Sequence, residues 1–199
     1  DLETTDFLFK LNLNSEGPHG VVQPTGLYVK DLNHIYVSSY VYSGLMRVDT
    51  TCHIIQKIPY GITSKGYNVL PSYTPSSHPY IAPVIIDKKI YITQNAIDRF
   101  HPIVDTPLSV VIDTVQKSCE DLPLTYGILT EKELAIKDPR FSRVFNGKEF
   151  IYSFYVSEDI VVTSVDHSEV KKISVKSKYL DSPIVRQEVS ERGPQLNLE

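Results

Sequence analysis

The sequence predicts an all-β fold built from a repeated unit of short antiparallel strands, and three observations support this prediction. Apolar residues recur at every second position over many short segments, as in half-buried strands. Thirteen prolines and nine glycines interrupt the chain too often for long helices. The aromatic residues are thirteen Tyr and seven Phe without a Trp, and Tyr suits a sheet surface that is partly packed and partly wet.

The first repeat occupies residues 7–58. Phe7, Phe9, Leu11 and Leu13 stand at alternate positions, which predicts a strand. The turn-rich segment 15–20 follows, and further strands are expected at 26–29, 35–39, 45–49 and 53–58. Because only tight turns separate these strands, we expect them to form a meander.

The same order recurs twice along the chain, and Ile35-Tyr36-Val37-Ser38, Ile90-Tyr91-Ile92-Thr93 and Ile160-Val161-Val162-Thr163 align as its core. Four-stranded repeats at intervals of roughly 40 to 70 residues are typical of propeller blades with loop insertions. We therefore expect a β-propeller-like array of four-stranded antiparallel blades in which about three blades are present, an incomplete propeller. The expected domain spans 1–182, with blades at approximately 7–58, 80–122 and 140–180, and 183–199 is a polar tail that is partly disordered or begins a further blade.

Three local signals refine this prediction. Asp49-Thr50 and Asp113-Thr114 each close a strand, where the Asp side chain can accept hydrogen bonds from the backbone of the outer turn. Asn146-Gly147 predicts a type I′ hairpin turn. Thr130 and Glu133 have the spacing of a capping box, which predicts a helix of about two turns that ends before Asp138-Pro139.

Several segments resemble a known family. Ser15-Glu16-Gly17-Pro18-His19-Gly20-Val21 resembles the Gly-Pro motif that opens blades of bacterial six-bladed propellers. Gly26–Val29, Ile35–Tyr40, Phe145–Phe154 and Lys176–Tyr179 are similar to an uncharacterised Bacteroidetes lipoprotein family of unknown function with six-bladed, NHL-like β-propellers. This resemblance spans most of residues 7–180.

The resemblance implies export to the periplasm or the outer-membrane surface as a lipoprotein, with a lipid anchor on a cysteine upstream of Asp1. It carries over no catalytic residues. A complete propeller of that type needs roughly 300 residues or more, at about 50 per blade. The chain is therefore expected to be a fragment, a shortened relative or half of an assembly.

Composition and motifs exclude several functions. The net charge of −4 and the scattered Lys and Arg residues give no basic surface for nucleic acid. The sequence has no nucleotide-binding, serine-hydrolase, zinc-protease or EF-hand motif, and its six His residues stand singly, so we expect no catalytic residues, metal or cofactor. Cys52 and Cys119 follow the Asp-Thr strand ends of different repeats, so we expect similar places on different blades and two free thiols.

Two segments, 59–83 and 94–107, exceed normal connection lengths, and long ordered loops often carry function. Their prolines would stiffen them and reduce the entropy lost on binding. The alternative is that both loops cover an incomplete propeller edge as a lid. The candidate ligand-binding residues, a mixture of flat rings and hydrogen-bond donors suited to sugar or peptide, are Tyr73, His78, Tyr80, Arg99 and His101.

The leading hypothesis is a non-catalytic binding module of the bacterial cell envelope that holds a carbohydrate, a peptide or an envelope protein through its blade loops. A structural subunit of an envelope complex and a propeller enzyme acting on polysaccharide are the alternatives. Contact with a membrane is expected only through the lipid anchor. Because about three blades leave open sheet edges, we also expect self-association or irregular blades at the ends.

Overall fold

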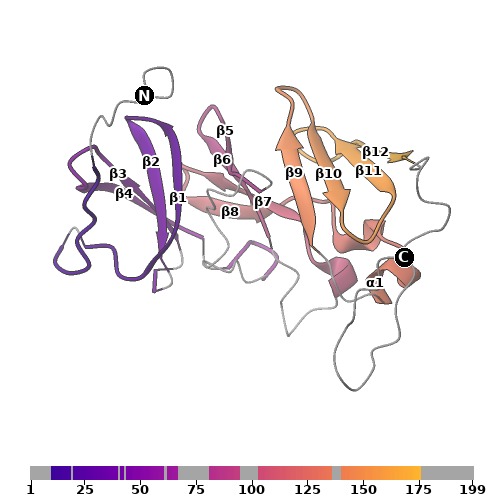
Figure 1. Ribbon diagram of the computed structural model, residues 1–199, viewed down its shortest axis with the longest axis horizontal. Helices are drawn as coiled ribbons and strands as arrows, with labels where there is room; N and C mark the ends of the chain where they lie inside the picture. Colours follow the sequence, from indigo (N-terminus) through magenta and orange to yellow (C-terminus); the bar gives the residue numbers. More distant parts are fainter. Residues whose placement is uncertain are drawn as a thin grey trace, which may run out of the picture.

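The computed structural model describes residues 10–18, 20–39, 41–42, 44–60, 62–66, 81–94, 103–135 and 140–175. These residues form three four-stranded antiparallel sheets, and the strands of each sheet pair in the order in which they occur along the chain (Figure 1). The described part has almost no helix, and its sheets do not close into a barrel. The prediction of an all-β fold built from repeated four-stranded meanders is confirmed at this level.

The sheets take their strands from separate stretches of the chain. The first sheet contains β1 (Pro24–Asp31), β2 (His34–Ser39), β3 (Gly44–Val48) and β4 (Ile54–Pro59). The second contains β5 (Val84–Ile86), β6 (Lys89–Thr93), β7 (Ser109–Asp113) and β8 (Ser118–Asp121). The third contains β9 (Phe141–Phe145), β10 (Phe150–Phe154), β11 (Asp159–Thr163) and β12 (Val170–Ser174). The short helical elements are η2 (Ile103–Asp105), η3 (Tyr126–Ile128) and α1 (Glu131–Ala135).

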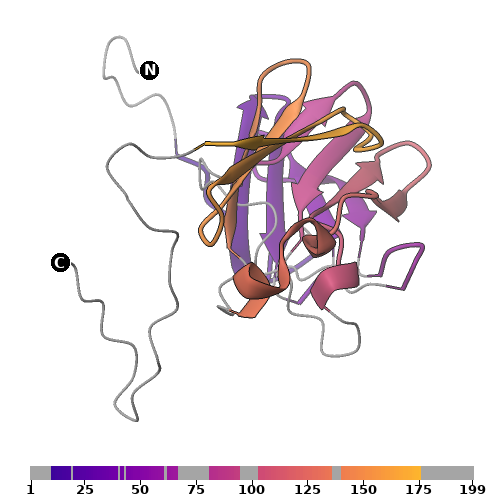
Figure 2. The same ribbon diagram turned by 90° about the vertical axis from the view of Figure 1, so that its right-hand side faces the viewer.

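The sheets stack face to face in chain order, as Figures 1 and 2 show from two directions. Alternation along the strands gives each sheet two faces. Tyr36 and Leu45 of the first sheet share a buried cluster with Ile90 and Ile112 of the second. The opposite face of the second sheet, with Tyr91, shares a cluster with the aromatic side chains of the third sheet. Two core layers therefore lie between the three sheets, and this layering fixes the relative positions of the loops.

The N-terminal segment covers the other face of the first sheet. Leu11 and Leu13 pack against the cluster that contains Ile35, Val37 and Met46. The prediction of a strand at 7–13 is wrong for Lys10–Leu13, because these residues lie outside every strand. The rest of the predicted strand falls within residues 1–9, which lie outside the described part. The alternating pattern is nevertheless explained, because an extended segment that lies on an apolar face also places every second side chain against it.

The turns follow the predicted chemistry in part. The Asp49 carboxylate accepts hydrogen bonds from the backbone of Thr51 and His53, and Asp113 does the same for the residues after it, as predicted. The β9–β10 hairpin is confirmed, but the predicted type I′ turn is wrong. Gly147 has φ +96°, whereas Asn146 does not adopt positive φ and its side chain accepts from two backbone N–H groups ahead of it. A four-residue loop closed by an Asx interaction thus replaces the two-residue turn.

Both cysteines are free and buried, but they do not occupy equivalent places. Cys52 lies in the β3–β4 turn with φ +66°, whereas Cys119 lies within β8 opposite Ile112. The position that matches Cys119 in the first sheet is Ile54, because Cys119 pairs with Ile112 as Ile54 pairs with Val48, and the stretch between the paired residues is one residue longer in the second sheet. Burial raises the pKa of Cys119 to about 12, so this thiol stays protonated at neutral pH.

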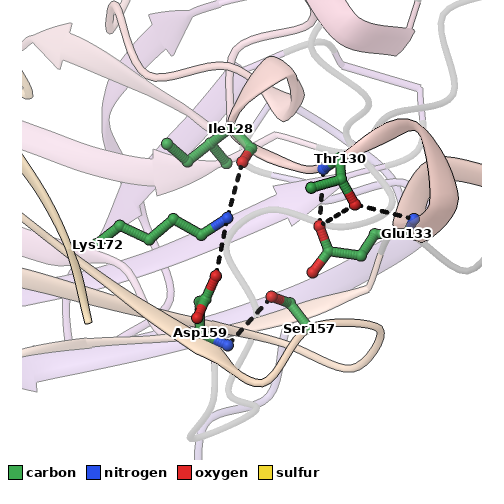
Figure 3. Close-up of polar contacts among 6 residues, drawn as sticks. All are labelled: Ile128, Thr130, Glu133, Ser157, Asp159 and Lys172. Carbon is green, nitrogen blue, oxygen red and sulfur yellow. Dashed lines mark hydrogen bonds and ion pairs between the residues drawn. The ribbon is translucent and has the colours of Figure 1, made fainter. Parts of the chain in front are cut away.

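The predicted capping box begins α1, as Figure 3 shows. The Thr130 N–H donates to Glu133 Oε2 at 2.7 Å, and the Glu133 N–H donates to Thr130 Oγ1 at 3.3 Å. Close to this helix, Lys172 Nζ lies 2.9 Å from Asp159 Oδ2 and 3.4 Å from the Ile128 carbonyl oxygen. These contacts join the edge of the third sheet to the segment that enters α1. Residues 136–137, which the sequence assigns to the same helix, lie outside the described part.

Replacing Glu133 by alanine is expected to lower the free energy of unfolding by about 1 kcal/mol, because the Thr130 N–H loses its acceptor. Urea denaturation measures this change. Glu131→Ala is the matched control, since it removes a carboxylate from the same first turn without touching the cap, and we expect it to cost less than about 0.5 kcal/mol. Equal effects of the two substitutions would mean that helix charge, and not the capping box, holds the helix start.

Candidate functional site

The two long connections meet the second sheet at the same end. β5 and β6 are antiparallel neighbours joined by a short turn, with Val84 opposite Tyr91. The connection from β4 therefore enters β5 at the end of the sheet where β6 leaves for the β6–β7 connection. We call this end the loop end of the second sheet. The opposite end carries only the short turns at 87–88 and 114–117.

The predicted ligand-binding residues fall within these connections but outside the described residues. Tyr73, His78 and Tyr80 belong to 67–80, and Arg99 and His101 belong to 95–102. The described residues that flank these two segments thus lie at one end of one sheet. The convergence of the five side chains themselves stays a prediction.

A buried carboxylate lies at the loop end. Ile92, Val110 and Asp121 are cross-strand neighbours in one row, on the face that packs against the first sheet. Asp121 is buried, and Thr63 Oγ1 donates a hydrogen bond of 2.5 Å to its Oδ2. The Ser64 N–H also donates to the Cys119 carbonyl at 3.2 Å. These bonds fasten the start of the long β4–β5 connection to β8.

Gln94 is the most unusual side chain at this end. Its backbone N–H donates to the Leu108 carbonyl at 2.9 Å, which extends the β6–β7 pairing by one step beyond the strand. The residue is 3% exposed, and neither its amide oxygen nor its amide nitrogen makes a hydrogen bond to any residue that the structure describes. Leaving a buried polar group unsatisfied costs about 1–3 kcal/mol, and such groups in folded proteins call for a functional or structural explanation.

A second polar cluster lies on the opposite face of the second sheet, around Arg143 of β9. Arg143 Nη1 donates to Ser109 Oγ at 3.0 Å, and its Nη2 donates to the carbonyl oxygens of Ala82 at 2.9 Å and Tyr91 at 3.1 Å. Ala82 is two residues before β5. The guanidinium group therefore binds the end of the β4–β5 connection and also joins the third sheet to the second.

The cluster continues as a chain of hydrogen bonds. Ser109 Oγ lies 2.8 Å from Tyr152 OH, which lies 2.5 Å from His167 Nε2. His167 Nδ1 lies 3.2 Å from the Val165 carbonyl oxygen. Because a carbonyl can only accept, Nδ1 carries the imidazole proton and Nε2 accepts from the tyrosine hydroxyl. The neutral imidazole thus fits both of its partners.

Burial dominates the electrostatics of this cluster. Desolvation lowers the pKa of His167 to about 4 and raises the pKa of Tyr152, so both groups are neutral at pH 7. Among the described residues no carboxylate pairs with Arg143, whose cation is held by oxygen dipoles and lies over the Phe150 ring at 5.1 Å. With Arg143, Tyr152 and His167 all buried, the arrangement is suited to holding the two sheets together.

The sequence could have revealed part of this cluster. Phe141, Arg143 and Phe145 alternate along one strand, so an arginine on the aromatic inner face follows from the pattern. Nothing in the sequence singles out Gln94. Among the described residues, no three His, Cys, Asp or Glu side chains form a group that could hold a metal ion. No helix within the described ranges is long and apolar enough to cross a membrane.

Comparisons with known proteins agree with this fold. The crystal structure of a DUF4221 family member from Bacteroides vulgatus ATCC 8482 superposes with a TM-score of 0.74 at 18% sequence identity, covering 92% of this chain and 52% of that chain. The present chain therefore spans about half the length of that protein. The comparison with curated proteins found no match. The model of the family described as domain of unknown function DUF4221 matches residues 1–195, and the chain accordingly belongs to the DUF4221 family.

Proposed function

We propose that the chain is a non-catalytic binding module that holds a carbohydrate or a peptide at the loop end of its second sheet. The observation that carries this proposal is the placement of Gln94. Its amide is buried where two long connections meet the same sheet, and both of its polar atoms are unpaired among the described residues. An amide offers one acceptor and two donors, which match the hydroxyl groups of a sugar or the backbone of a peptide.

We further propose that the three sheets are blades of an incomplete β-propeller. Sequential four-stranded meanders that stack face to face support this arrangement. The similar protein of about twice the length supports it as well, since a complete ring needs more blades than three. In this arrangement the loop end would belong to the face on which propellers gather their ligand-binding loops.

We propose that the protein is exported and lipid-anchored in the cell envelope. This rests on the resemblance of its blade segments to exported lipoproteins and on the Bacteroides origin of the similar structure. Fractionation of the native cells with an antibody against residues 1–199 tests it. Recovery in the outer-membrane fraction, lost after the upstream cysteine is replaced, is the expected result, and recovery in the cytoplasm would contradict it.

Gln94→Leu is the most direct test of the binding site. Screening on glycan and peptide arrays would first identify a ligand, and calorimetry would measure its dissociation constant. Leucine has nearly the same shape but no polar atom to leave unpaired, so we expect unchanged or higher thermal stability. We also expect the dissociation constant to rise about tenfold, which corresponds to roughly 1.4 kcal/mol for a lost hydrogen bond to the ligand.

Gln56→Leu is the matched control for this substitution. Gln56 Nε2 donates to the Thr114 carbonyl at 3.1 Å, at the opposite end of the second sheet. We therefore expect lower stability and unchanged affinity. If Gln94→Leu leaves affinity unchanged, the amide does not face the ligand and the proposed site is wrong.

The loops are tested separately through Tyr80→Ala and Arg99→Ala. If they hold the ligand, both substitutions weaken binding while the melting temperature stays within a degree or two, on the order expected for surface substitutions. If they serve only as a lid over an open edge, the melting temperature falls by several degrees and affinity does not change. The two outcomes distinguish a binding surface from a structural cover.

A further inference from the structure

A pocket lies at the end of the first sheet that carries the β1–β2 and β3–β4 turns. Its volume is about 370 Å³, which is within the range of pockets that hold small molecules. The residues around it come from both turns and from the strands next to them. Among the described residues that line it are Leu32, Asn33, His34, Arg47, Asp49 and Ile55. We call it the turn pocket.

The turn pocket lies at the opposite end of the array from the loop end. Gln56 is the cross-strand neighbour of Arg47, and its Nε2 donates to the Thr114 carbonyl at 3.1 Å. Thr114 belongs to the β7–β8 turn, at the end of the second sheet opposite the loop end. A ligand in the turn pocket would therefore not touch Gln94, and the inference made here does not rest on the proposed function.

Arg47 is the cation of the turn pocket, and its bonding is incomplete. It is the cross-strand neighbour of Tyr36, whose pKa is raised by burial, and the positive charge of Arg47 opposes this rise. Within the described part of the chain, no carboxylate lies close enough to Arg47 to form an ion pair. Its Nε is buried and makes no hydrogen bond to any residue that the structure describes. A carboxylate brought by a ligand would supply the acceptor that this guanidinium group lacks.

Arg143 shows how the same molecule completes the bonding of an arginine. The Nε of Arg143 is also unpaired among the described residues, but its two Nη atoms donate to three oxygen atoms, those of Ser109 Oγ and of the Ala82 and Tyr91 carbonyls. Arg47 has no comparable set of oxygen acceptors among the described residues. The difference lies in the whole guanidinium group and not in Nε alone.

The carboxylates near the pocket are bonded to their own turns. Asp31 Oδ1 lies 2.9 Å from His34 Nδ1, and Asp49 Oδ1 accepts from the Thr51 N–H at 2.9 Å and from the Thr51 hydroxyl at 2.7 Å. These hydrogen bonds lower the pKa of both carboxyl groups, so both are charged at neutral pH. The pocket thus combines the Asp49 carboxylate with an arginine that no described carboxylate neutralises.

We propose that the turn pocket binds a small sugar acid and that Arg47 holds the carboxylate of this ligand. The guanidinium group presents a planar fork of N–H donors that matches the two oxygens of a carboxylate. A phosphate fits less well, because only one arginine faces its second negative charge and the Asp49 carboxylate in the lining repels it.

The other lining residues fit the rest of such a molecule. Asn33 offers an amide to the hydroxyl groups, and His34 offers Nε2, the ring nitrogen that does not face Asp31. Leu32 is 54% exposed and Ile55 is 50% exposed, so both present apolar surface to the C–H groups of a sugar ring. Apolar walls with a few polar groups that fix orientation are usual in sites for small molecules.

The test is a titration of the isotope-labelled chain with D-glucuronate, followed by NMR at the Arg47 Nε–H and at the backbone amides of Asn33 and Thr50. We expect saturable shifts with a dissociation constant of about 1 mM, the affinity of a ligand with about thirteen non-hydrogen atoms. D-glucose has the same ring without the carboxylate and should cause no saturable shift. Glucose 6-phosphate, which carries the doubly charged group, should bind more weakly than glucuronate.

Two substitutions of Arg47 and one control complete the test, with the amides of Asn33 and Thr50 as reporters. Arg47→Met keeps the length of the side chain without its charge and should weaken glucuronate binding about tenfold or more. Arg47→Lys keeps the charge without the fork and should weaken binding about threefold or more. Lys30→Met is the matched control, because Lys30 is exposed in β1 of the same sheet and does not line the pocket, so its loss should leave binding unchanged.

The outcomes separate this site from the proposed one. Absence of a saturable shift with glucuronate overturns the inference, as does an equal response to glucose or a stronger one to glucose 6-phosphate. Full binding by Arg47→Met overturns it as well. If neither Arg47 variant gives the dispersed spectrum of a folded chain, the comparison of glucuronate with glucose in the wild type decides. Gln94→Leu should leave glucuronate binding unchanged, so failure at one end of the array is distinguishable from failure at the other.

Discussion

Arg143→Ala is expected to lower the free energy of unfolding by about 3 kcal/mol, the largest effect we expect from a polar residue of this protein. The substitution removes three hydrogen bonds from a charged donor, each worth roughly 1.5–3 kcal/mol before the cost of burying the charge is subtracted. It also leaves Ser109 and the Ala82 carbonyl without this donor and opens a space beside the Phe150 ring. Urea denaturation at pH 7.5 would measure the loss.

Two further variants show which part of the arginine matters. Arg143→Met fills the space without donating hydrogen bonds, so we expect it to stay within about 1 kcal/mol of the alanine variant if the bonds dominate. Lys148→Ala, which removes a cation from the exposed β9–β10 turn, should cost less than about 0.5 kcal/mol. Recovery of nearly full stability by Met would show that packing, and not hydrogen bonding, is what Arg143 contributes.

His167 should make the fold sensitive to acid. We expect its titration to lower the free energy of unfolding by about 3 kcal/mol between pH 7 and pH 4. Its pKa is about 4 in the folded protein, below the usual value of 6.5. Between these two values the unfolded chain binds a proton that the folded protein excludes. The contribution of the neutral imidazole to the free energy of unfolding is therefore fully present above about pH 6.5, and it is lost progressively as the pH drops toward 4. The physical cause is burial, and a proton on Nε2 would also remove the acceptor of the Tyr152 hydroxyl.

His167→Gln isolates this contribution, because glutamine does not titrate but can still accept from the tyrosine hydroxyl. We expect the variant to be less stable at pH 7.5 yet to lose about 3 kcal/mol less than the wild type on going to pH 4. Asp166 beside it has a pKa lowered to about 2 by hydrogen bonds from Ser164 and Ser168, and it titrates below this window in both proteins. Parallel stability curves for variant and wild type would show that His167 is not the acid-sensitive group.

The fold could be predicted because its signal is periodic. Ile35, Ile90 and Ile160 each begin a segment with a two-residue period, and each lies in the second or third strand of a sheet. The same signal gave a wrong strand at Lys10–Leu13. Alternation shows that every second side chain meets an apolar surface, but it does not show that the backbone pairs with another strand. It also could not fix the turn at Asn146, where the side-chain carbonyl replaces a backbone partner.

The candidate site was less accessible to prediction. Segment length singled out two connections, and the structure shows that their flanks share one end of a sheet, while their role in binding stays a prediction. The importance of Gln94 depends on a buried amide that finds no hydrogen-bond partner among the described residues, and that property belongs to the packed structure alone. Asp121 likewise looks like an ordinary strand-end acid in the sequence, and only its register with Ile92 and Val110 shows that it is buried.

The sequential order of the strands has a consequence for how the protein folds. Every strand pairs with its neighbour in the sequence, so each sheet forms from one uninterrupted stretch of chain. Except for the β6–β7 pair, which is joined by a long connection, these contacts close only short turns and form rapidly, whereas contacts between distant segments arise only when sheets stack. During synthesis all four strands of the first sheet leave the ribosome before those of the second, so we expect each new sheet to assemble on the one before it.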